Sequence, residues 1–130
     1  RSLREGRCVA LLIDQHASSP PRVTVPFLGR PARTTASLGW LATRLDAPLI
    51  PVRSRPLPDG GYRIHYHPPI DTPTEGPIDE RALEVTRRAL SLLEGWIREE
   101  PETWLWLHDR WKGCPSGETW PQTALIEEAQ

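Results

Sequence analysis

The side chains best suited to catalysis or ligand binding are Asp14, Gln15 and His16, which directly follow the apolar run of residues 8–13. A short apolar run bounded by turn-forming residues is typical of a strand buried on both faces. Ligands of open α/β sheets bind at the carboxyl ends of such strands. Asp14 is therefore a candidate for catalysis or for orienting a substrate. The alternative is an aspartate that only hydrogen-bonds the following loop.

A second candidate group comprises Arg30 and Arg33, which flank Pro31-Ala32 just before a predicted helix that Thr34 or Thr35 can cap. Guanidinium groups and free N–H groups converge at such a place, an arrangement that suits an anion or a phosphate. The alternative is a pair of ordinary surface arginines, because 15 of the 16 basic residues are arginine.

The histidines suggest a metal site only weakly. His65 and His67 share one face of a predicted strand, but the sequence offers no obvious third ligand, so a solvated polar face is favoured and no metal is predicted. No histidine is followed by an acidic residue in a His-x4-Asp/Glu pattern. Nucleophile-elbow, P-loop and dinucleotide-binding motifs are also absent from the sequence.

Composition restricts the class of protein. The chain has 130 residues, of which 38% are hydrophobic and 25% charged, and its net charge is −1. These values are typical of one globular domain. A net charge close to zero produces no overall positive potential that would attract nucleic acid. The longest apolar run is too short for a transmembrane helix, which needs about 20 residues. Because the sequence has no methionine, even at position 1, we expect a processed or partial chain.

The predicted elements indicate an α/β fold with a mostly parallel sheet and flanking helices. Strands at residues 9–13 and 49–52, joined by a helix ending near Leu45, would form a βαβ unit. Alternation over residues 62–67 predicts a half-buried strand in a hairpin, and a long C-terminal helix begins near Asp79. The tryptophan-rich residues 104–111 favour a packed element with one polar tip; the alternatives are a binding platform and a membrane-interface belt.

Five segments, read in order, then carry a shared pattern: CVALLIDQH (8–16), VTVPFLGRPART (23–34), APLIPV (47–52), LPDGGY with HPP (57–62 and 67–69) and PETWLWLHDRWK (101–112). Together they resemble the bacterial lipid A biosynthesis acyltransferases, the lauroyl- and myristoyl-transferase branch of the lysophospholipid acyltransferase superfamily. The resemblance implies that residues 1–112 are the C-terminal part of an acyltransferase domain with a partial glycerolipid-acyltransferase-like fold. Residues 113–130 would then be a polar tail.

The resemblance also implies a reaction. A fatty acyl group would pass from acyl carrier protein, or from acyl-CoA, to a hydroxyl of a glycolipid acceptor such as a lipid A precursor, with no further cofactor. The family's His-x4-Asp/Glu motif and hydrophobic membrane anchor would lie before Arg1, so this chain would hold no catalytic residue. It would work at the cytoplasmic face of the bacterial inner membrane.

The implied substrate-binding residues of this chain are Asp14, Gln15, Arg30, Arg33 and Thr34. Two alternatives stay open. The acceptor could be a phosphatidylinositol mannoside or another lipid of the same superfamily, or the chain could be a non-catalytic fragment that acts as a binding module.

Overall fold

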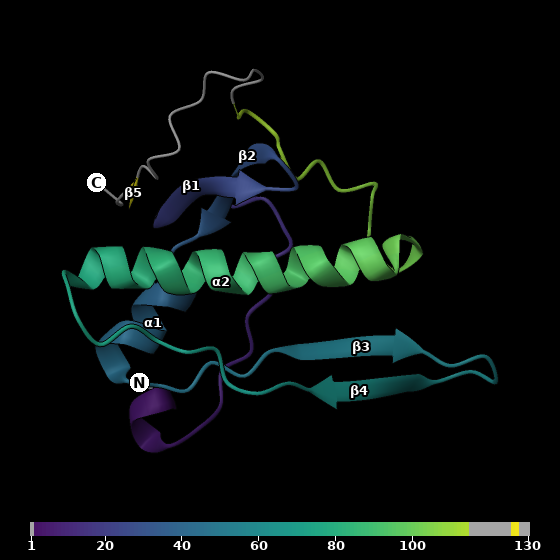
Figure 1. Ribbon diagram of the computed structural model, residues 1–130, viewed down its shortest axis with the longest axis horizontal. Helices are drawn as coiled ribbons and strands as arrows, with labels where there is room; N and C mark the ends of the chain where they lie inside the picture. The colour runs from purple at the N-terminus through teal and green to yellow at the C-terminus, as the bar shows by residue number, and fades with distance from the viewer. Residues whose placement is uncertain (1, 115–125, 128–130) are drawn as a thin grey trace.

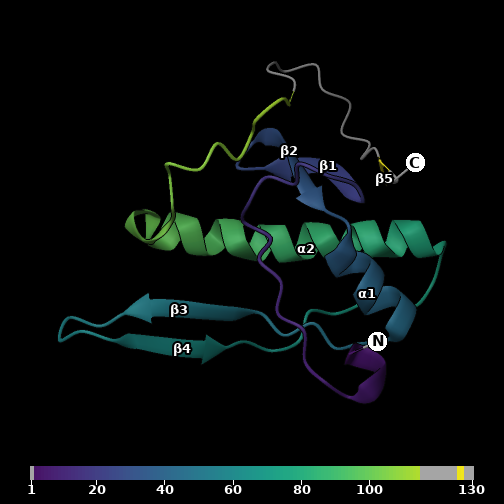
Figure 2. The same cartoon turned by 180° about the vertical axis from the view of Figure 1, so that it is seen from behind.

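A computed structural model describes residues 2–114 and 126–127 (Figure 1). In chain order the elements are the 3-10 helix η1 (Ser2–Glu5), strands β1 (Arg22–Phe27) and β2 (Arg30–Thr35), helix α1 (Ser37–Leu45), strands β3 (Val52–Pro56) and β4 (Tyr62–Tyr66), helix α2 (Ile78–Glu99), the 3-10 turn η2 (Pro101–Thr103) and strand β5 (Ile126–Glu127). Helix α2 lies between the β1–β2 hairpin on one side and α1 with the β3–β4 hairpin on the other, as Figure 2 also shows from behind.

The first hairpin is made by a two-residue turn, Leu28-Gly29, whose φ angles of 49° and 77° are both positive. Two positive φ angles are typical of the tight turns that match the twist of antiparallel strands. Strands β1 and β2 pair from Phe27 opposite Arg30 to Arg22 opposite Thr35. Strand β5 pairs antiparallel with the start of β1, which gives the sheet order β2-β1-β5.

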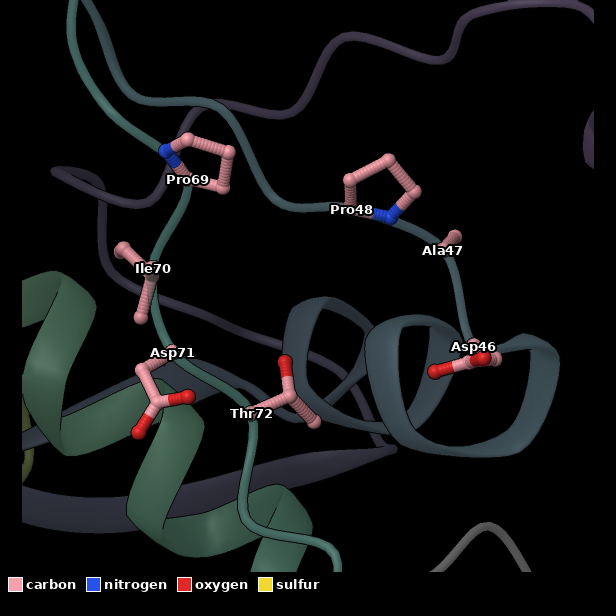
Figure 3. A pocket seen from close by; sticks show the side chains of 7 residues that line it. All are labelled: Asp46, Ala47, Pro48, Pro69, Ile70, Asp71 and Thr72. Atoms are coloured by element: carbon pink, nitrogen blue, oxygen red, sulfur yellow. The ribbon is translucent and has the colours of Figure 1, made fainter.

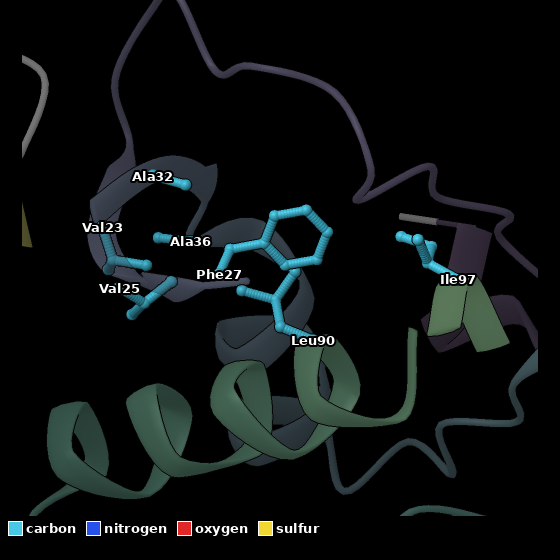
Figure 4. Close-up of a cluster of buried hydrophobic side chains, with 7 residues drawn as sticks. All are labelled: Val23, Val25, Phe27, Ala32, Ala36, Leu90 and Ile97. Atoms are coloured by element: carbon cyan, nitrogen blue, oxygen red, sulfur yellow. The ribbon is translucent and has the colours of Figure 1, made fainter. Parts of the chain in front are cut away.

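The core lies between this hairpin and α2 (Figure 4). Alternate residues of β1, namely Val23, Val25 and Phe27, are buried, as expected for one face of a strand. Leu90 and Ile97 of α2 complete the cluster together with small residues of β2 and of the turn into α1. This packing fixes the position of β2, which carries several candidate site residues.

Helices α1 and α2 meet at Gly39. A Cβ atom at this position would lie 1.9 Å from the carbonyl oxygen of Ala82 and 2.7 Å from Oγ1 of Thr86. Because only a residue without a side chain allows this approach, Gly39 sets the spacing of the two helices.

The β3–β4 hairpin packs through its polar face. Arg53 is only 9% exposed; its guanidinium donates to carboxylates of Glu99 (2.7 Å) and Glu100 (2.9 Å) and lies 5.5 Å from the ring centre of Trp96. The opposite face carries Tyr62, which is 71% exposed. Ion pairs from β3 thus hold the polar face of the hairpin on α2, and in the neighbouring residues 62–67 His65 and His67 are half-buried whereas Arg63 is exposed.

The predicted mostly parallel sheet is wrong, because both observed sheets are antiparallel. Residues 8–13 form no strand, Leu12 is 77% exposed and Cys8 is exposed. A strand requires a hydrogen-bonding partner on at least one edge, and no strand in the described part of the chain pairs with these residues. The predicted βαβ unit is consequently absent from residues 2–114.

Two further predictions concern the C-terminal tail and membrane-spanning segments. The polar tail at residues 113–130 lies outside the described residues, except for Gly113, Cys114 and β5. No helix in the described ranges is both long and apolar enough to cross a membrane.

Candidate functional site

The segment that carries Asp14, Gln15 and His16 lies against two distant parts of the chain. The backbone N–H of His16 donates a 2.7 Å hydrogen bond to Nε2 of His108. The next residue, Ala17, donates its N–H to the carbonyl oxygen of Arg33 in β2 at 3.1 Å. The segment is thus held between β2 and the C-terminal residues 104–114, not at the end of a parallel strand.

Arg110 holds the C-terminal residues 104–114 against β2 through hydrogen bonds. Its side chain is fully buried, and its guanidinium donates to the Arg33 carbonyl oxygen at 2.6 Å and to Oγ1 of Thr34 at 2.5 Å. The guanidinium also lies 5.0 Å from the ring centre of Phe27. Burial lowers the pKa of Arg110 to about 10, against the opposing influence of Cys114 and Asp14. Arg110 therefore stays charged at neutral pH.

Three buried polar atoms at this place have no hydrogen-bond partner within residues 2–114. They are Oδ1 of Asp14, Nδ1 of His16 and Nε of Arg110. Most buried polar atoms in proteins are hydrogen-bonded, so a local group of exceptions requires an explanation. A ligand that supplies hydroxyl groups and an anionic group would satisfy both the carboxylate and the nitrogen atoms.

The electrostatic environment of His16 is strongly positive. Burial lowers the pKa of its imidazole, and neighbouring positive groups lower it further: Arg33, Arg110, Arg22 and His108. Because these groups favour neutral histidine, they also favour an anion in the same place. Asp14 is the acidic residue that acts on Arg110 here.

The structure brings some of the predicted site residues together and leaves others apart. Asp14, the backbone of Arg33 and the hydroxyl of Thr34 gather around Arg110. Thr34 is fully buried and its hydroxyl accepts the Arg110 bond, so it supports the site from behind. Gln15 and Arg30 are exposed, and the Arg30 guanidinium lies 4.8 Å from the ring centre of Trp111.

Arg110 is the residue that sequence reasoning missed, and His108 was considered there only as one of the histidines that could serve in catalysis or bind a metal. The tryptophan-rich segment was predicted to be a packing element, and Trp104 does contact Phe27 edge-on at a ring distance of 5.8 Å. The available signal was the polar triplet His-Asp-Arg between Leu107 and Trp111, since polar residues within an aromatic segment need partners when they are buried.

The pair of His65 in β4 and His67 directly after it is not part of a metal site in the described ranges. The ring of His67 packs on Trp96 with ring centres 4.7 Å apart. Among residues 2–114 and 126–127, no three His, Cys, Asp or Glu side chains are grouped so that they could hold a metal ion.

An open pocket of about 350 Å³ lies elsewhere, between the loop after α1 and the loop after β4 (Figure 3). Its lining includes two carboxylates, Asp46 and Asp71, and no basic side chain. Asp71 accepts a 3.0 Å bond from Arg88. None of the predicted site residues lines this pocket, so the chemistry of the two places is different.

Comparison with known proteins agrees with the resemblance seen in the sequence. Residues 1–113 match the family "Bacterial lipid A biosynthesis acyltransferase". The chain is also 31% identical over 120 residues, 90% of its length, to a lipid A biosynthesis lauroyltransferase of Escherichia coli (strain K12). It spans 38% of that relative's length. The chain therefore belongs to the bacterial lipid A biosynthesis acyltransferase family.

Proposed function

We propose that the chain is part of an acyltransferase that moves a fatty acyl group from acyl carrier protein, or from acyl-CoA, to a hydroxyl of a glycolipid acceptor such as a lipid A precursor. The acceptor oxygen would attack the thioester carbonyl, and the carrier thiol would leave. The family match and the lauroyltransferase relative support this reaction. We place the reaction at the cytoplasmic face of the bacterial inner membrane.

Within this proposal the chain contributes the acceptor side of the active site. Residues 1–130 contain no His-x4-Asp/Glu motif, so the general base would come from another part of the protein and the isolated chain would be inactive. The observation that carries the acceptor assignment is the unpartnered Oδ1 of Asp14 beside the positive groups around His16.

The proposed contacts combine the residue types with their positions in the structure. The Asp14 carboxylate would accept hydrogen bonds from sugar hydroxyls, and the exposed Gln15 would bind the same headgroup. The Arg33 guanidinium would bind a phosphate or carboxylate of the acceptor. Thr34 and Arg110 would hold β2 in place, since their polar groups bind each other. Arg30 would contact the acceptor from the exposed end of β2, beside Trp111.

The experiment that tests this assignment uses the 130-residue chain itself. The isotope-labelled chain is titrated with a detergent-solubilised phosphorylated disaccharide glycolipid while backbone amide shifts are recorded. We expect saturable shifts at Asp14, Gln15 and Arg33. We expect an approximately tenfold weaker affinity for Arg33→Gln, the loss of one charge-assisted contact. The matched control is Arg63→Gln, because Arg63 is exposed on β4 and should leave the affinity unchanged.

Two results would contradict the assignment. One is a shift pattern centred on the Asp46–Asp71 pocket. The other is an affinity that Arg33→Gln and Arg63→Gln lower equally, which would indicate only diffuse attraction between basic residues and an anionic lipid.

A further inference from the structure

His108 joins two parts of the chain that lie far apart in the sequence. Its Nε2 atom accepts a 2.7 Å hydrogen bond from the backbone N–H of His16, which is 92 residues away. A ring nitrogen accepts a hydrogen bond only while it carries no proton, so this bond requires a neutral His108 with its hydrogen on Nδ1. The contact therefore depends on the protonation state of one half-buried imidazole.

This hydrogen bond fixes residues 14–17, which we call the Asp14 segment. The segment belongs to no helix or strand, so no ladder of backbone bonds holds it. Its backbone donors bind elsewhere: the N–H of His16 bonds to His108, and the N–H of Ala17 bonds to the Arg33 carbonyl oxygen at 3.1 Å. Asp14, whose Oδ1 has no partner within residues 2–114, lies two residues before the first of these bonds. The position of its carboxylate therefore depends on the bond to His108.

The imidazole of His108 is itself held in place from β2. The His108 carbonyl oxygen accepts a 2.8 Å bond from the N–H of Arg110, whose guanidinium donates to the Arg33 carbonyl oxygen at 2.6 Å. Together with the bonds of the Asp14 segment, these bonds form a closed circuit through His16, His108, Arg110, Arg33 and Ala17. Residues 104–114 run from the end of α2 toward the β1–β2 hairpin (Figure 1), so the circuit ties the Asp14 segment to β2.

We propose that His108 is a positioning residue for the glycolipid acceptor: its neutral imidazole holds Asp14 in the site, and protonation of the ring releases Asp14. The inference rests on the proposed function, in which Asp14 accepts hydrogen bonds from the acceptor. A protonated ring presents an N–H group where the lone pair was, so two donors would face each other across 2.7 Å. The bond then breaks, the Asp14 segment loses this anchor and the affinity for the acceptor falls.

The groups around the contact determine which titration matters. The charged and titratable side chains come from β1, β2, the Asp14 segment and residues 104–114, and they are Arg22, Arg33, Asp14, His16, Arg110 and Cys114. The arginines stay charged throughout the range in which histidines titrate, including Arg110 with its pKa of about 10. His16 contributes its backbone N–H, which does not titrate, and burial and then Arg33 lower the pKa of its ring. The partner whose protonation breaks the bond is therefore His108.

The first test follows the backbone amide of His16 by NMR in the isotope-labelled 130-residue chain, from about pH 8 to about pH 5. In the wild-type chain, acidification should move the amide shift from a hydrogen-bonded to a solvent-exposed value. His108→Gln places an oxygen acceptor that does not titrate near the position of Nε2, so the amide should stay hydrogen-bonded over the whole range. His108→Phe keeps a ring without an acceptor, so the amide should have the exposed shift at every pH.

The second test titrates the same chains with a detergent-solubilised phosphorylated disaccharide glycolipid. At about pH 8, His108→Phe should lower the affinity about fivefold and His108→Gln by less than about twofold. On acidification the wild-type chain should lose about fivefold in affinity relative to His108→Gln. Protonation of the lipid phosphate affects both chains equally, and a new positive charge alone would strengthen binding of an anionic lipid. A fall in affinity thus reports release of Asp14.

His65→Phe is the matched control, because His65 is half-buried in β4 and lies outside the circuit of hydrogen bonds. It should bind the glycolipid like the wild-type chain and leave the His16 amide unchanged. Circular dichroism checks that each variant keeps the fold.

The proposal is overturned if the His16 amide shift is the same in all variants, or if His108→Gln loses affinity as strongly as His108→Phe. It is also overturned if acidification weakens binding by the wild-type chain no more than binding by His108→Gln. Failure of the proposed function looks different. If the wild-type chain does not bind the glycolipid at any pH, the acceptor assignment fails, whereas the amide shifts still decide whether His108 holds the Asp14 segment.

Discussion

Replacing Arg110 with lysine tests the buried contact that holds the C-terminal segment on β2. Lysine keeps the positive charge but can reach only one of the two acceptors, the Arg33 carbonyl oxygen at 2.6 Å or Oγ1 of Thr34 at 2.5 Å. A charge-assisted hydrogen bond is worth about 1.5–3 kcal/mol, and the lost contact with the Phe27 ring adds about 0.5–2 kcal/mol. We therefore expect Arg110→Lys to lower the free energy of unfolding by about 2–5 kcal/mol.

The burial cost of the charge does not offset this loss. The pKa of Arg110 falls to about 10, which corresponds to a penalty of about 3 kcal/mol for keeping the group charged. A lysine ammonium is more strongly hydrated than a guanidinium, so its burial costs at least as much and the substitution recovers none of the penalty. The difference between the two residues is thus the second hydrogen bond and the ring contact.

Denaturant unfolding measures this difference, with Arg98→Lys as the control. Arg98 is 62% exposed and pairs with Glu94 one helical turn away, so its substitution should change stability by less than about 0.5 kcal/mol. A loss below about 0.5 kcal/mol for Arg110→Lys as well would refute the reasoning, because the guanidinium fork would then contribute little to the fold.

Two further predictions concern packing and protonation. Gly39→Ala should lower the free energy of unfolding by about 1–3 kcal/mol, since its Cβ would overlap the Ala82 carbonyl. Gly95→Ala, where a Cβ meets nothing within 4 Å, should raise it by about 0.5–1 kcal/mol, and a reversed order in thermal unfolding would exclude the close approach. The pKa of His16 is lowered by burial and then by Arg33, so the unfolded chain binds more protons below about pH 6.5, and stability should decrease as the pH falls there. An NMR titration should show that Arg33→Gln moves the His16 pKa back toward its ordinary value, and an unchanged pKa would remove Arg33 from the cluster.

The sequence predicted the local elements better than their arrangement. The long C-terminal helix and the hairpin β3–β4 are visible as periodic patterns, because each depends on contacts close in sequence. The parallel sheet was inferred from residues 8–13, whose apolar composition does not reveal whether a partner strand exists. The β1–β2 hairpin was not predicted, because its turn is Leu28-Gly29 and lacks the Asn or Asp that usually marks such turns.

The candidate site shows the same difference between what local sequence predicts and what depends on contacts between distant residues. Asp14 and Arg33 could be selected from residue type and position, and Thr34 through the family resemblance; in the structure all three lie around one buried arginine. Arg110 is marked in the sequence only by its place in the polar triplet of residues 108–110, and its partners lie 76 and 77 residues away. Periodicity and spacing describe neighbours along the chain, whereas a buried charge depends on which distant carbonyl and hydroxyl groups the fold brings to it.

The measurement that tests the central claim most directly is the rate of fatty acyl transfer from acyl carrier protein to the glycolipid acceptor by the protein that carries this chain. Wild type is compared with Asp14→Asn and Arg33→Gln, and Arg63→Gln is the control. If this chain forms the acceptor side of the site, both site variants raise the acceptor KM about tenfold while the donor KM stays constant. A raised donor KM with an unchanged acceptor KM, or no transfer by the wild-type protein, would contradict the account.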